Sequence, residues 1–342
     1  MSNPRNIPTY EEITERTTPS LTISKEVKEF YSGNTVLITG AGGSIGSRIV
    51  KQLSQIEGVR LVATDRDENS LHSLSLETSS KALFDDNVFK ILDIRDESGI
   101  DLILQEFSPS IVIHAAALKH LSVLESQPRE ALLTNCLGTY NLIKASNDFG
   151  VTKFLNISTD KAANPTSILG LSKLYTEKVI NKYRSDGRAN YTSVRFGNVF
   201  ASKGSVIQTF CHQIQMQMPI TLTDYEMKRF FMNINEAAFL AITALKLNSG
   251  QTHLLDMGDS IPIVKIIENL QKFYKSSLPI EITGVRAGEK LDEDLTAFYE
   301  TAKTSEHPKI RVIESQMESP KTIEWSDYLN NSTARKFFVD NR

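Results

Sequence analysis

Residues 35–65, TVLITGAGGSIGSRIVKQLSQIEGVRLVATD, join two apolar, β-branched stretches through a glycine-rich segment and an amphipathic one. The spacing of Gly40, Gly43 and Gly46 predicts a tight turn between the first strand and a helix at Ser47–Ile56. Such a turn lets the backbone approach a pyrophosphate, and the helix N-terminus offers it free N–H groups. The segment is therefore predicted to bind a dinucleotide.

The second strand, Val59–Thr64, supports this interpretation because it ends in an acid. Asp65 lies about 20 residues past the glycines, where a carboxylate accepts hydrogen bonds from the adenosine ribose. That carboxylate repels a 2′-phosphate and favours NAD, while the neighbouring Arg66 leaves NADP open. Ser44 and Ile45, at the start of the helix, are expected to contact the cofactor with the glycines.

The alternation of strands and helices continues beyond this unit. It predicts an α/β fold with a doubly wound, parallel Rossmann sheet. The further predicted strands are Val88–Leu92, Ile111–His114, Phe154–Ser158, Tyr191–Arg195 and Lys309–Ile313. The predicted helices are Asn69–Ser79, Asp96–Phe107, Gln127–Gly150 as one long helix, Leu171–Arg184 and Ile234–Leu247.

Polar and small residues follow the third and fourth strands, where open α/β sheets bind ligands. Asp93 and Ile94 are expected at the adenine, and the small side chains of Ala115 and Ala116 let a flat cofactor lie against the backbone. Lys119 is interpreted equally as a phosphate or ribose contact and as a solvated loop residue.

The polar triplet Thr159, Asp160 and Lys161 directly follows the strand at Phe154–Ser158. An acid, an ammonium and a hydroxyl at the carboxyl end of a central strand lie where this fold places its chemistry. Alone, the triplet is better explained as a solvated turn that caps a helix. Its place in the predicted sheet makes it the candidate catalytic group.

The next helix is expected to begin after Pro165, since the residue before a proline is disfavoured in α conformation. It would carry Leu169 and Lys173 on one face, four residues apart. His114, inside an apolar strand, is expected to be a hydrogen-bonded core residue.

Composition excludes several classes of protein. The 342 residues are 40% hydrophobic and 23% charged with a formal net charge of −3, which is ordinary for a globular protein and gives no basic surface for nucleic acid. Cys136 and Cys211 fit neither a disulfide framework nor zinc spacing, and no metal site is predicted. Without an apolar span or a leader, we expect a cytoplasmic protein.

The chain divides into an arm, a cofactor domain and a smaller mixed region. Residues 1–32 are expected to form an N-terminal arm that packs on its own core or a neighbouring subunit, or stays disordered. Residues 33–200 form the NAD-binding domain, with 225–260 packing back on it. Residues 201–224 and 261–342 are expected to form a smaller mixed region whose polar groups suit a diphosphate and a ribose. The candidate substrate-binding residues are Lys119, Asn198, Ser205, Val206, Arg229, Arg286 and Glu289.

Eight motifs occur in an order that resembles one family. They are TGAGGSIGS, DIRD, HAAALKH, TNCLGTYN, STDKAANPTS, RFGNVFASKGSV, KRFFMNINEA and GEKLDEDL. The chain resembles the extended short-chain dehydrogenase/reductases of polysaccharide biosynthesis (CapD-like), of the UDP-N-acetylglucosamine 4,6-dehydratase type, over residues 33–295. Larger members carry a membrane-spanning half, so this chain is similar to a free-standing, soluble catalytic domain. The resemblance also implies a homo-oligomer.

The resemblance implies a lyase that converts UDP-N-acetylglucosamine to a 4-keto-6-deoxy sugar. C4 is oxidised, water is eliminated across C5–C6, and the hydride returns to C6. Lys161 would be the base, Asp160 the acid and Thr159 the hydrogen-bond donor to O4, with Lys173 on the nicotinamide ribose. As a base, Lys161 would need a pKa lowered toward neutrality.

One position departs from the usual short-chain dehydrogenase motif, Tyr-x-x-x-Lys. Leu169 stands where the tyrosine is expected, as an apolar methionine does in the membrane-linked dehydratases that retain C5 configuration. The departure therefore favours that branch. The alternatives are a 5-epimerising dehydratase, a 4-epimerase, and a catalytically inactive nucleotide-sugar-binding regulator.

Overall fold

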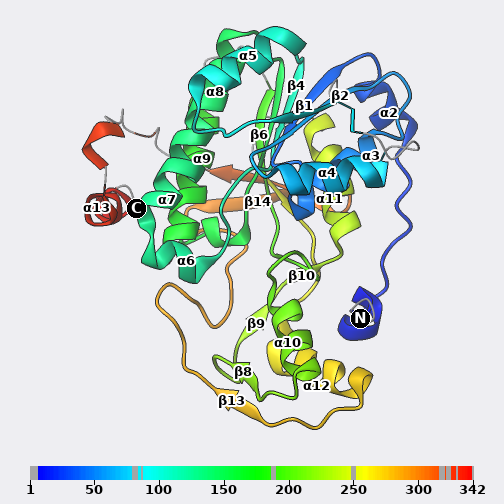
Figure 1. The fold of residues 1–342 in the computed structure, drawn as a ribbon, viewed down its shortest axis with the longest axis vertical. Coiled ribbons are helices and arrows are strands. Elements are labelled where there is room, and N and C mark those ends of the chain that lie inside the picture. Colours follow the sequence, from blue (N-terminus) through cyan, green and yellow to red (C-terminus); the bar gives the residue numbers. More distant parts are fainter. Residues whose placement is uncertain are drawn as a thin grey trace.

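The computed structural model describes residues 7–78, 84–85, 88–185, 190–247, 252–315, 320, 325–328 and 330–340. Its main feature is a nine-stranded sheet of order β14-β15-β11-β6-β5-β4-β1-β2-β3 (Figure 1). The strands from β11 to β3 in this order pair in parallel, which confirms the doubly wound α/β fold. They are β1 Thr35–Thr39, β2 Arg60–Asp65, β3 Phe89–Ile91, β4 Ile111–His114, β5 Lys153–Ile157, β6 Asn190–Arg195 and β11 Thr252–Leu255.

The sheet is buried on both faces, as the side chains of β1 show. Val36 and Ile38 point into one hydrophobic cluster, whereas Leu37 between them points into the other. The first cluster also receives the apolar faces of the helices α2 Lys25–Tyr31, α3 Ser44–Leu53, α4 Glu68–Thr78 and α11 Ile234–Lys246. The sequence predicted that the α11 region packs back on the main sheet, and contacts of α11 with α3, β5, β6 and β11 confirm this.

The second cluster lies under the helices of the opposite face. These are α5 Glu97–Phe107, α6 Leu121–Ser126, α7 Pro128–Glu130, η1 Ala131–Leu137, α8 Gly138–Asp148, α9 Ile168–Ser185 and α13 Asn331–Asp340, with the 3₁₀ turn η3 Trp325–Tyr328. The single helix predicted over Gln127–Gly150 is wrong in detail, because η1 is a π-helical segment. Asn135, within η1, bonds both backbone groups of Leu118 and the hydroxyl of Ser172, and these bonds lock the widened turn in place.

A third cluster forms the smaller region, below the sheet in Figure 1. It contains α1 Tyr10–Thr14, α10 Val206–Gln215 and α12 Ile263–Tyr274. Short strand pairs complete it: β7 Asn198–Val199 with β10 Phe231–Met232, β8 Ile220–Leu222 with β13 Ile280–Ile282, and β9 Lys228–Arg229 with β12 Ile261–Pro262.

The division predicted for the chain after residue 260 needs a correction. β14 Glu300–Thr304 and β15 Ile310–Ser315 form an antiparallel hairpin that extends the main sheet from β11. α13 packs against α7 and α9 on the same body. Burial of Ile310, Ile313, Phe337 and Phe338 in the two large clusters explains why these segments join the sheet and not the smaller region.

The described part of the N-terminal arm packs on this chain's own core. Ile13 is buried in the third cluster, and Tyr31 is buried in the first with its hydroxyl donating to Ile242 O at 2.9 Å. Residues 1–6 of the arm, and the end of the predicted helix at Ser79, lie outside the described residues. In the part of the chain that is described, no helix has the length and apolarity that crossing a membrane requires.

His114 is a core residue, as predicted. It is 1% exposed, and its two ring nitrogens lie 2.7 Å from Thr39 Oγ1 and 2.8 Å from Thr139 Oγ1. Burial lowers its pKa to about 3, so the ring is neutral and holds β1, β4 and α8 together. It stands beneath the site and takes no part in its lining.

Candidate active site

A cleft of about 550 Å³ opens at the carboxyl edge of the parallel sheet, and a smaller cavity of about 120 Å³ adjoins it. β1 and β4 are neighbours in the sheet, although the chain winds away from β1 toward β2 and β3 before returning. This reversal point is where open α/β sheets bind ligands. The loops that follow β1, β4, β5 and β6 all contribute to the lining of the cleft.

The glycine turn after β1 is built for close approach. Gly40 has φ +70°, and a Cβ there would lie 2.4 Å from Ala116 N. A Cβ at Gly46 would lie 2.2 Å from Gly40 O, so both glycines are required by packing. Gly43 is the N-cap of α3, which starts at Ser44, three residues earlier than predicted. Its first-turn N–H groups therefore point toward the cleft that Ser44 and Ile45 line.

The smaller cavity gathers the residues assigned to the adenosine end of the cofactor. Asp65, Arg66, Asp93, Ile94, Ala115 and Ala116 line it together with Gly40 and Gly43. Asp65 Oδ2 accepts a hydrogen bond from Gly42 N at 3.0 Å, so the acid also braces the glycine turn. Burial raises the pKa of Asp93, but hydrogen bonds from Arg95 outweigh burial and hold it below its usual range. A glycine cradle beside an acid and small side chains fits a dinucleotide.

Lys203, from the loop between β7 and α10, reaches across the glycine turn. Its ammonium donates to Gly42 O at 3.0 Å and to Ser70 Oγ at 3.2 Å, and its backbone N donates to Ser44 Oγ at 3.0 Å. The loop thus closes one side of the cleft, which Ser202, Lys203 and Gly204 line. Sequence reasoning gave this lysine no role, since nothing local indicates that residue 203 contacts residue 42.

The triplet Thr159–Lys161 follows β5 as the start of a 3₁₀ turn, η2 Asp160–Ala162. Thr159 is its N-cap, and the Thr159 hydroxyl donates to Asp160 Oδ1 at 2.9 Å. Thr159 and Lys161 line the cleft, and Asp160 does not. Asp160 is 0% exposed and lies behind its two neighbours, so the prediction of a carboxyl group facing the cleft needs correcting.

Packing holds the Asp160 carboxylate in that position. Its backbone N donates to Phe196 O at 3.1 Å, which ties the turn to the end of β6. A Cβ at Gly197 would lie 2.7 Å from Asp160 Oδ2, so the carboxylate presses directly on the Gly197 backbone. Among the described residues Oδ2 has no hydrogen-bond partner. A buried acceptor without a partner is uncommon in folded proteins.

Lys161 joins Asp160 to a second carboxylate. Its ammonium lies 3.1 Å from Asp160 Oδ1, 3.3 Å from Glu293 Oε1 and 3.4 Å from Asn198 Oδ1. Burial lowers the pKa of Lys161, but the attraction of Asp160 and Glu293 outweighs it and the net pKa is raised. The sequence analysis required a lowered pKa for Lys161 as a base, but the pKa is raised. Lys161 therefore carries a proton at neutral pH.

Leu169 and Lys173 lie on the same face of α9 and both line the cleft. Leu169 is 5% exposed, and its side chain has no proton to exchange. Lys173 is 8% exposed and donates to Ile157 O at 2.8 Å. Burial lowers its pKa to about 8, although Glu177 acts in the opposite direction. This lysine can therefore supply a positive charge next to the glycine turn and can lose it just above neutral pH.

The remaining predicted contacts separate into two groups. Lys119, Asn198, Ser205 and Val206 line the cleft, and Lys119 donates to Ser202 Oγ at 3.2 Å. Burial lowers the pKa of Lys119. The three others, Arg229, Arg286 and Glu289, do not line the cleft.

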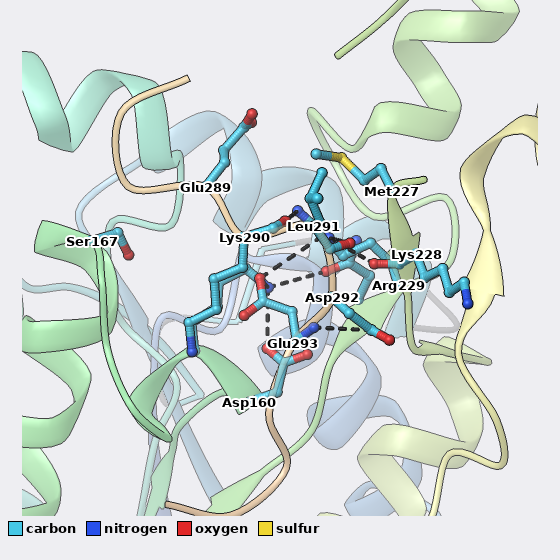
Figure 2. A network of polar contacts seen from close by, with 12 residues as sticks. Asp160, Ser167, Met227, Lys228, Arg229, Glu289, Lys290, Leu291, Asp292 and Glu293 are labelled. Carbon is cyan, nitrogen blue, oxygen red and sulfur yellow. Dashed lines mark hydrogen bonds and ion pairs between the residues drawn. The ribbon is translucent and has the colours of Figure 1, made fainter. Parts of the chain in front are cut away.

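The Arg229 guanidinium is occupied by backbone carbonyls. It donates to Lys228 O, Lys290 O and Leu291 O at 2.6, 2.9 and 3.1 Å (Figure 2). Arg286 is exposed, and its backbone N donates to Glu289 Oε2 at 3.2 Å. The Arg229 guanidinium therefore binds the backbone of this loop, and neither arginine lines the cleft.

Comparison with known proteins shows which family this chain resembles. Residues 36–315 match the family described as "Polysaccharide biosynthesis protein". The chain is 38% identical over 296 residues to the probable polysaccharide biosynthesis protein EpsC of Bacillus subtilis, covering 84% of this chain and 49% of that protein. It is 39% identical over 282 residues to the capsular polysaccharide biosynthesis protein CapD of Staphylococcus aureus, covering 80% and 46%. Over 285 residues it is 32% identical to a UDP-glucose 4-epimerase of Rickettsia rickettsii, covering 81% of each.

Among solved structures, Pen from Bacillus thuringiensis superposes with a TM-score of 0.76 at 32% identity, covering 92% of this chain and 99% of that one. The fold and the matched motifs define an extended short-chain dehydrogenase/reductase. The chain belongs to the CapD-like polysaccharide biosynthesis family of these enzymes. It spans about half the length of EpsC and CapD.

Proposed function

We propose that this chain is an NAD-dependent sugar-nucleotide 4,6-dehydratase that converts UDP-N-acetylglucosamine to UDP-2-acetamido-2,6-dideoxy-4-keto-hexose with retention at C5. One observation carries the proposal. Thr159 and Lys161, with Asp160 directly behind them, meet the glycine turn and Lys173 at one cleft, while the apolar Leu169 lines it between them. The site thus has proton-transfer groups without a phenol.

The residues that would hold the cofactor are Gly40, Gly43 and Gly46 at the pyrophosphate, Asp65 at the adenosine ribose and Lys173 at the nicotinamide ribose. A bound nicotinamide supplies the reversible acceptance of a hydride from C4 and its return to C6. Lys173 would place a positive charge beside that exchange. Asn198 and Lys119 line the same cleft and would contact the sugar nucleotide.

Proton transfer rests on the Lys161–Asp160 pair. A proton that moves from Lys161 Nζ to Asp160 Oδ1, across 3.1 Å, converts the ion pair into a neutral amine and a neutral acid without changing the net charge. The amine takes the C5 proton, which the C4 ketone makes acidic. Asp160 gives its proton through the Thr159 hydroxyl, 2.9 Å away, to the departing C6 oxygen, which leaves as water. Elimination thus leaves the pair ionised. The Lys161 ammonium then returns a proton to C5 as the hydride adds to C6. C4 oxidation released the O4 proton to water, and the Lys161 amine takes one proton back from water, so the full cycle conserves protons.

This route reconciles the raised pKa of Lys161 with a role as base. The resting ammonium is the stable form, and the base exists only when Asp160 holds the proton. Because Asp160 is excluded from solvent, its proton reaches the cleft through Thr159 or Lys161 alone among the described residues.

A 4-epimerase is the second candidate, because the relative from Rickettsia rickettsii is called a UDP-glucose 4-epimerase. The two reactions differ at C5 and C6. A 4-epimerase never breaks the C5–H bond, whereas a 4,6-dehydratase must exchange it. The triplet supplies both an acid and a base for elimination across C5–C6, which a 4-epimerase does not need.

The test is a proton NMR time course with UDP-N-acetylglucosamine and NAD⁺ in deuterium oxide. We expect a 4-keto-6-deoxy product that carries deuterium at C5 in the original configuration. A product inverted at C5 would identify a 5-epimerising dehydratase, and a C4 epimer without label at C5 would identify an epimerase. Tight NAD⁺ binding with no conversion of any UDP-hexose would identify a regulator that has lost catalysis.

A further inference from the structure

The loop of residues 286–293, here called the GEKL loop, lies directly on residues 159–163, here called the catalytic turn. Lys290 Nζ donates to Ala163 O at 3.2 Å, two residues after Lys161. Thr166 Oγ1 donates to Gly288 O at 3.1 Å. Gly288 has φ +80°, and a Cβ there would lie 2.9 Å from the Ser167 Cβ, so the loop contacts the start of α9 without a gap.

Arg229 holds the GEKL loop from its other side. Its guanidinium donates to the carbonyls of Lys290 and Leu291, and Lys228 N donates to Leu291 O at 2.8 Å (Figure 2). The loop is therefore fixed between β9 and the catalytic turn by hydrogen bonds to backbone carbonyls. Its last residue, Glu293, follows immediately after these anchors.

Glu293 brings a second carboxylate to Lys161. The residue is 8% exposed, and its Oε1 lies 3.3 Å from Lys161 Nζ and 3.8 Å from Arg229 Nε. A carboxylate this deeply buried needs a cationic partner. The Arg229 Nη groups already donate to three carbonyls, and Lys161 is the nearer cation. Figure 2 shows Glu293 next to Asp160, and both carboxylates contact the Lys161 ammonium.

We propose that Glu293 is a positioning residue for Lys161, which it holds at the cleft between two carboxylates so that the GEKL loop and the catalytic turn act as one proton-handling unit. The inference rests on the proposed function. Glu293 does not line the cleft, so it acts through Lys161 and not on the substrate. Without Glu293, Lys161 would keep only Asp160 as an ionic partner among the described residues.

The charges that face Lys161 determine the effect of losing Glu293. They are Asp160 on its own turn, Glu293 on the GEKL loop and Arg229 on β9, with the Asn198 amide oxygen from β7. Asp160 and Glu293 stabilise the ammonium, and burial and Arg229 oppose it. Replacing Glu293 with a neutral side chain therefore makes Lys161 lose its proton at lower pH.

The test compares the wild type with Glu293→Gln and Glu293→Asp in the full chain. We expect the falling, alkaline limb of the kcat–pH profile for UDP-N-acetylglucosamine to move down by about one pH unit in Glu293→Gln. The proposed mechanism starts with the proton on Lys161, and an opposite charge at this distance shifts a pKa by about that much or more. KM should change less than about twofold, since Glu293 does not line the cleft. Glu293→Asp should restore most of the wild-type profile.

A second measurement needs no turnover. Reductive ¹³C-methylation of the lysines, with the Lys161 signal assigned from Lys161→Arg, gives the titration midpoint of Lys161 by NMR. Asp294→Asn is the matched control, because Asp294 is the neighbouring residue and pairs with Lys290, not Lys161. We expect the midpoint to fall in Glu293→Gln and to stay in Asp294→Asn.

The two measurements separate the possible failures. An unchanged Lys161 midpoint in Glu293→Gln, or an equal shift in Asp294→Asn, overturns the role of Glu293 even if the enzyme dehydrates its substrate. A shifted midpoint in a protein that dehydrates no UDP-sugar supports the role of Glu293 and refutes the proposed function.

Discussion

At the scale of single residues, the proposed site depends on a carboxylate that substrate does not touch. Asp160 is buried against Gly197, and its contacts are the Thr159 hydroxyl and the Lys161 ammonium. Such a group controls the protonation of its neighbours, because burying a charge makes its interaction with them stronger than in water. The chemistry at the cleft is then carried by Thr159 and Lys161.

The first prediction concerns Asp160→Asn and Lys161→Ala. Each removes one member of the pair that exchanges the proton, so kcat for dehydration should fall by about 10²- to 10⁴-fold, the range that general acid–base catalysis supplies. NAD⁺ affinity should change less than about threefold, because neither residue lines the adenosine cavity. Steady-state kinetics and a fluorescence titration with NAD⁺ measure the two quantities.

Lys182→Ala is the control, since Lys182 lies exposed on α9, away from the cleft. Thermal melting should show that Asp160→Asn remains folded. Full dehydratase activity in either site variant would contradict the assigned roles.

The sequence predicted the residues of this site that lie close together along the chain. The triplet and the glycine turn are each recognisable from neighbouring residues alone, and residues of both line the cleft. Glu293 and Lys203 were missed because their partners, Lys161 and Gly42, lie far away in sequence. Arg229 was predicted to contact substrate because its charge suggested an anion, whereas the fold directs its guanidinium to three backbone carbonyls.

At the scale of elements, the loop between β7 and α10 connects the smaller region to the glycine turn. Lys203 makes this connection through its ammonium and its backbone N. A cofactor that lies on the glycine turn has to enter and leave past this loop. The hydrogen bonds of Lys203 should therefore affect how fast the cofactor leaves.

The second prediction is that Lys203→Ala releases NAD⁺ faster. Loss of two hydrogen bonds from a charged donor corresponds to about 1–2 kcal/mol, so we expect roughly a 5- to 30-fold higher dissociation rate constant. Stopped-flow displacement of NADH measures that rate. Lys51→Ala on α3, which removes an ion pair with Glu77, is the control. An unchanged rate in Lys203→Ala would show that the loop does not restrain the cofactor.

A buried ion-pair network joins three elements behind the catalytic turn. Arg195 of β6 is 0% exposed and donates to both carboxylate oxygens of Glu177 on α9 and of Glu300 on β14. Ser158, next to the triplet, also donates to Glu177. Breaking such a network by removing one partner is costly, because the other charges stay buried without compensation.

The third prediction is that Arg195→Met destabilises the fold by about 3–5 kcal/mol, because the buried carboxylates of Glu177 and Glu300 both lose their ion pair with Arg195. Urea unfolding followed by far-UV circular dichroism measures the change. The control is Lys303→Met. Lys303 lies on β14, as Glu300 does, and forms an exposed ion pair with Glu314, so its replacement should change stability by about 0.5 kcal/mol or less. A loss below about 1 kcal/mol in Arg195→Met would show that the network contributes little.

At the scale of the whole molecule, the sequence predicted six of the seven parallel strands and also β15, but neither β11 nor the edge strand β14. Most of the parallel strands are short apolar runs bounded by turn residues, because they are buried on both faces. β14, with the sequence ETAKT, lies at the edge with mostly exposed or half-buried side chains, so it carries no apolar signal. α13 is recognisable only by Phe337 and Phe338, whose partners on α7 and α9 lie far away in sequence.

The core also makes the stability of the whole fold depend on pH. His114 and His253 are buried and neutral, and burial lowers their pKa values to about 3 and about 4. The unfolded chain binds protons at both residues below its ordinary histidine pKa of about 6.5, whereas the folded chain does not. Stability is therefore fully present above pH 6.5 and is lost as the pH falls toward 4, by up to about 1.4 kcal/mol per pH unit for each histidine.

The fourth prediction isolates this effect with His114→Gln. Glutamine keeps a hydrogen-bonding side chain between Thr39 and Thr139 but binds no proton, so the variant should be less stable at pH 8 and lose stability less steeply from pH 6.5 to 4. The slope should be smaller by about 1 kcal/mol per pH unit, close to one proton's share. Urea midpoints at four pH values measure it, with His72→Gln on the exposed side of α4 as the control. Equal slopes for His114→Gln and the wild type would mean that carboxylates alone govern the acid unfolding of this fold, and that the neutral histidine between β1 and α8 contributes nothing to it.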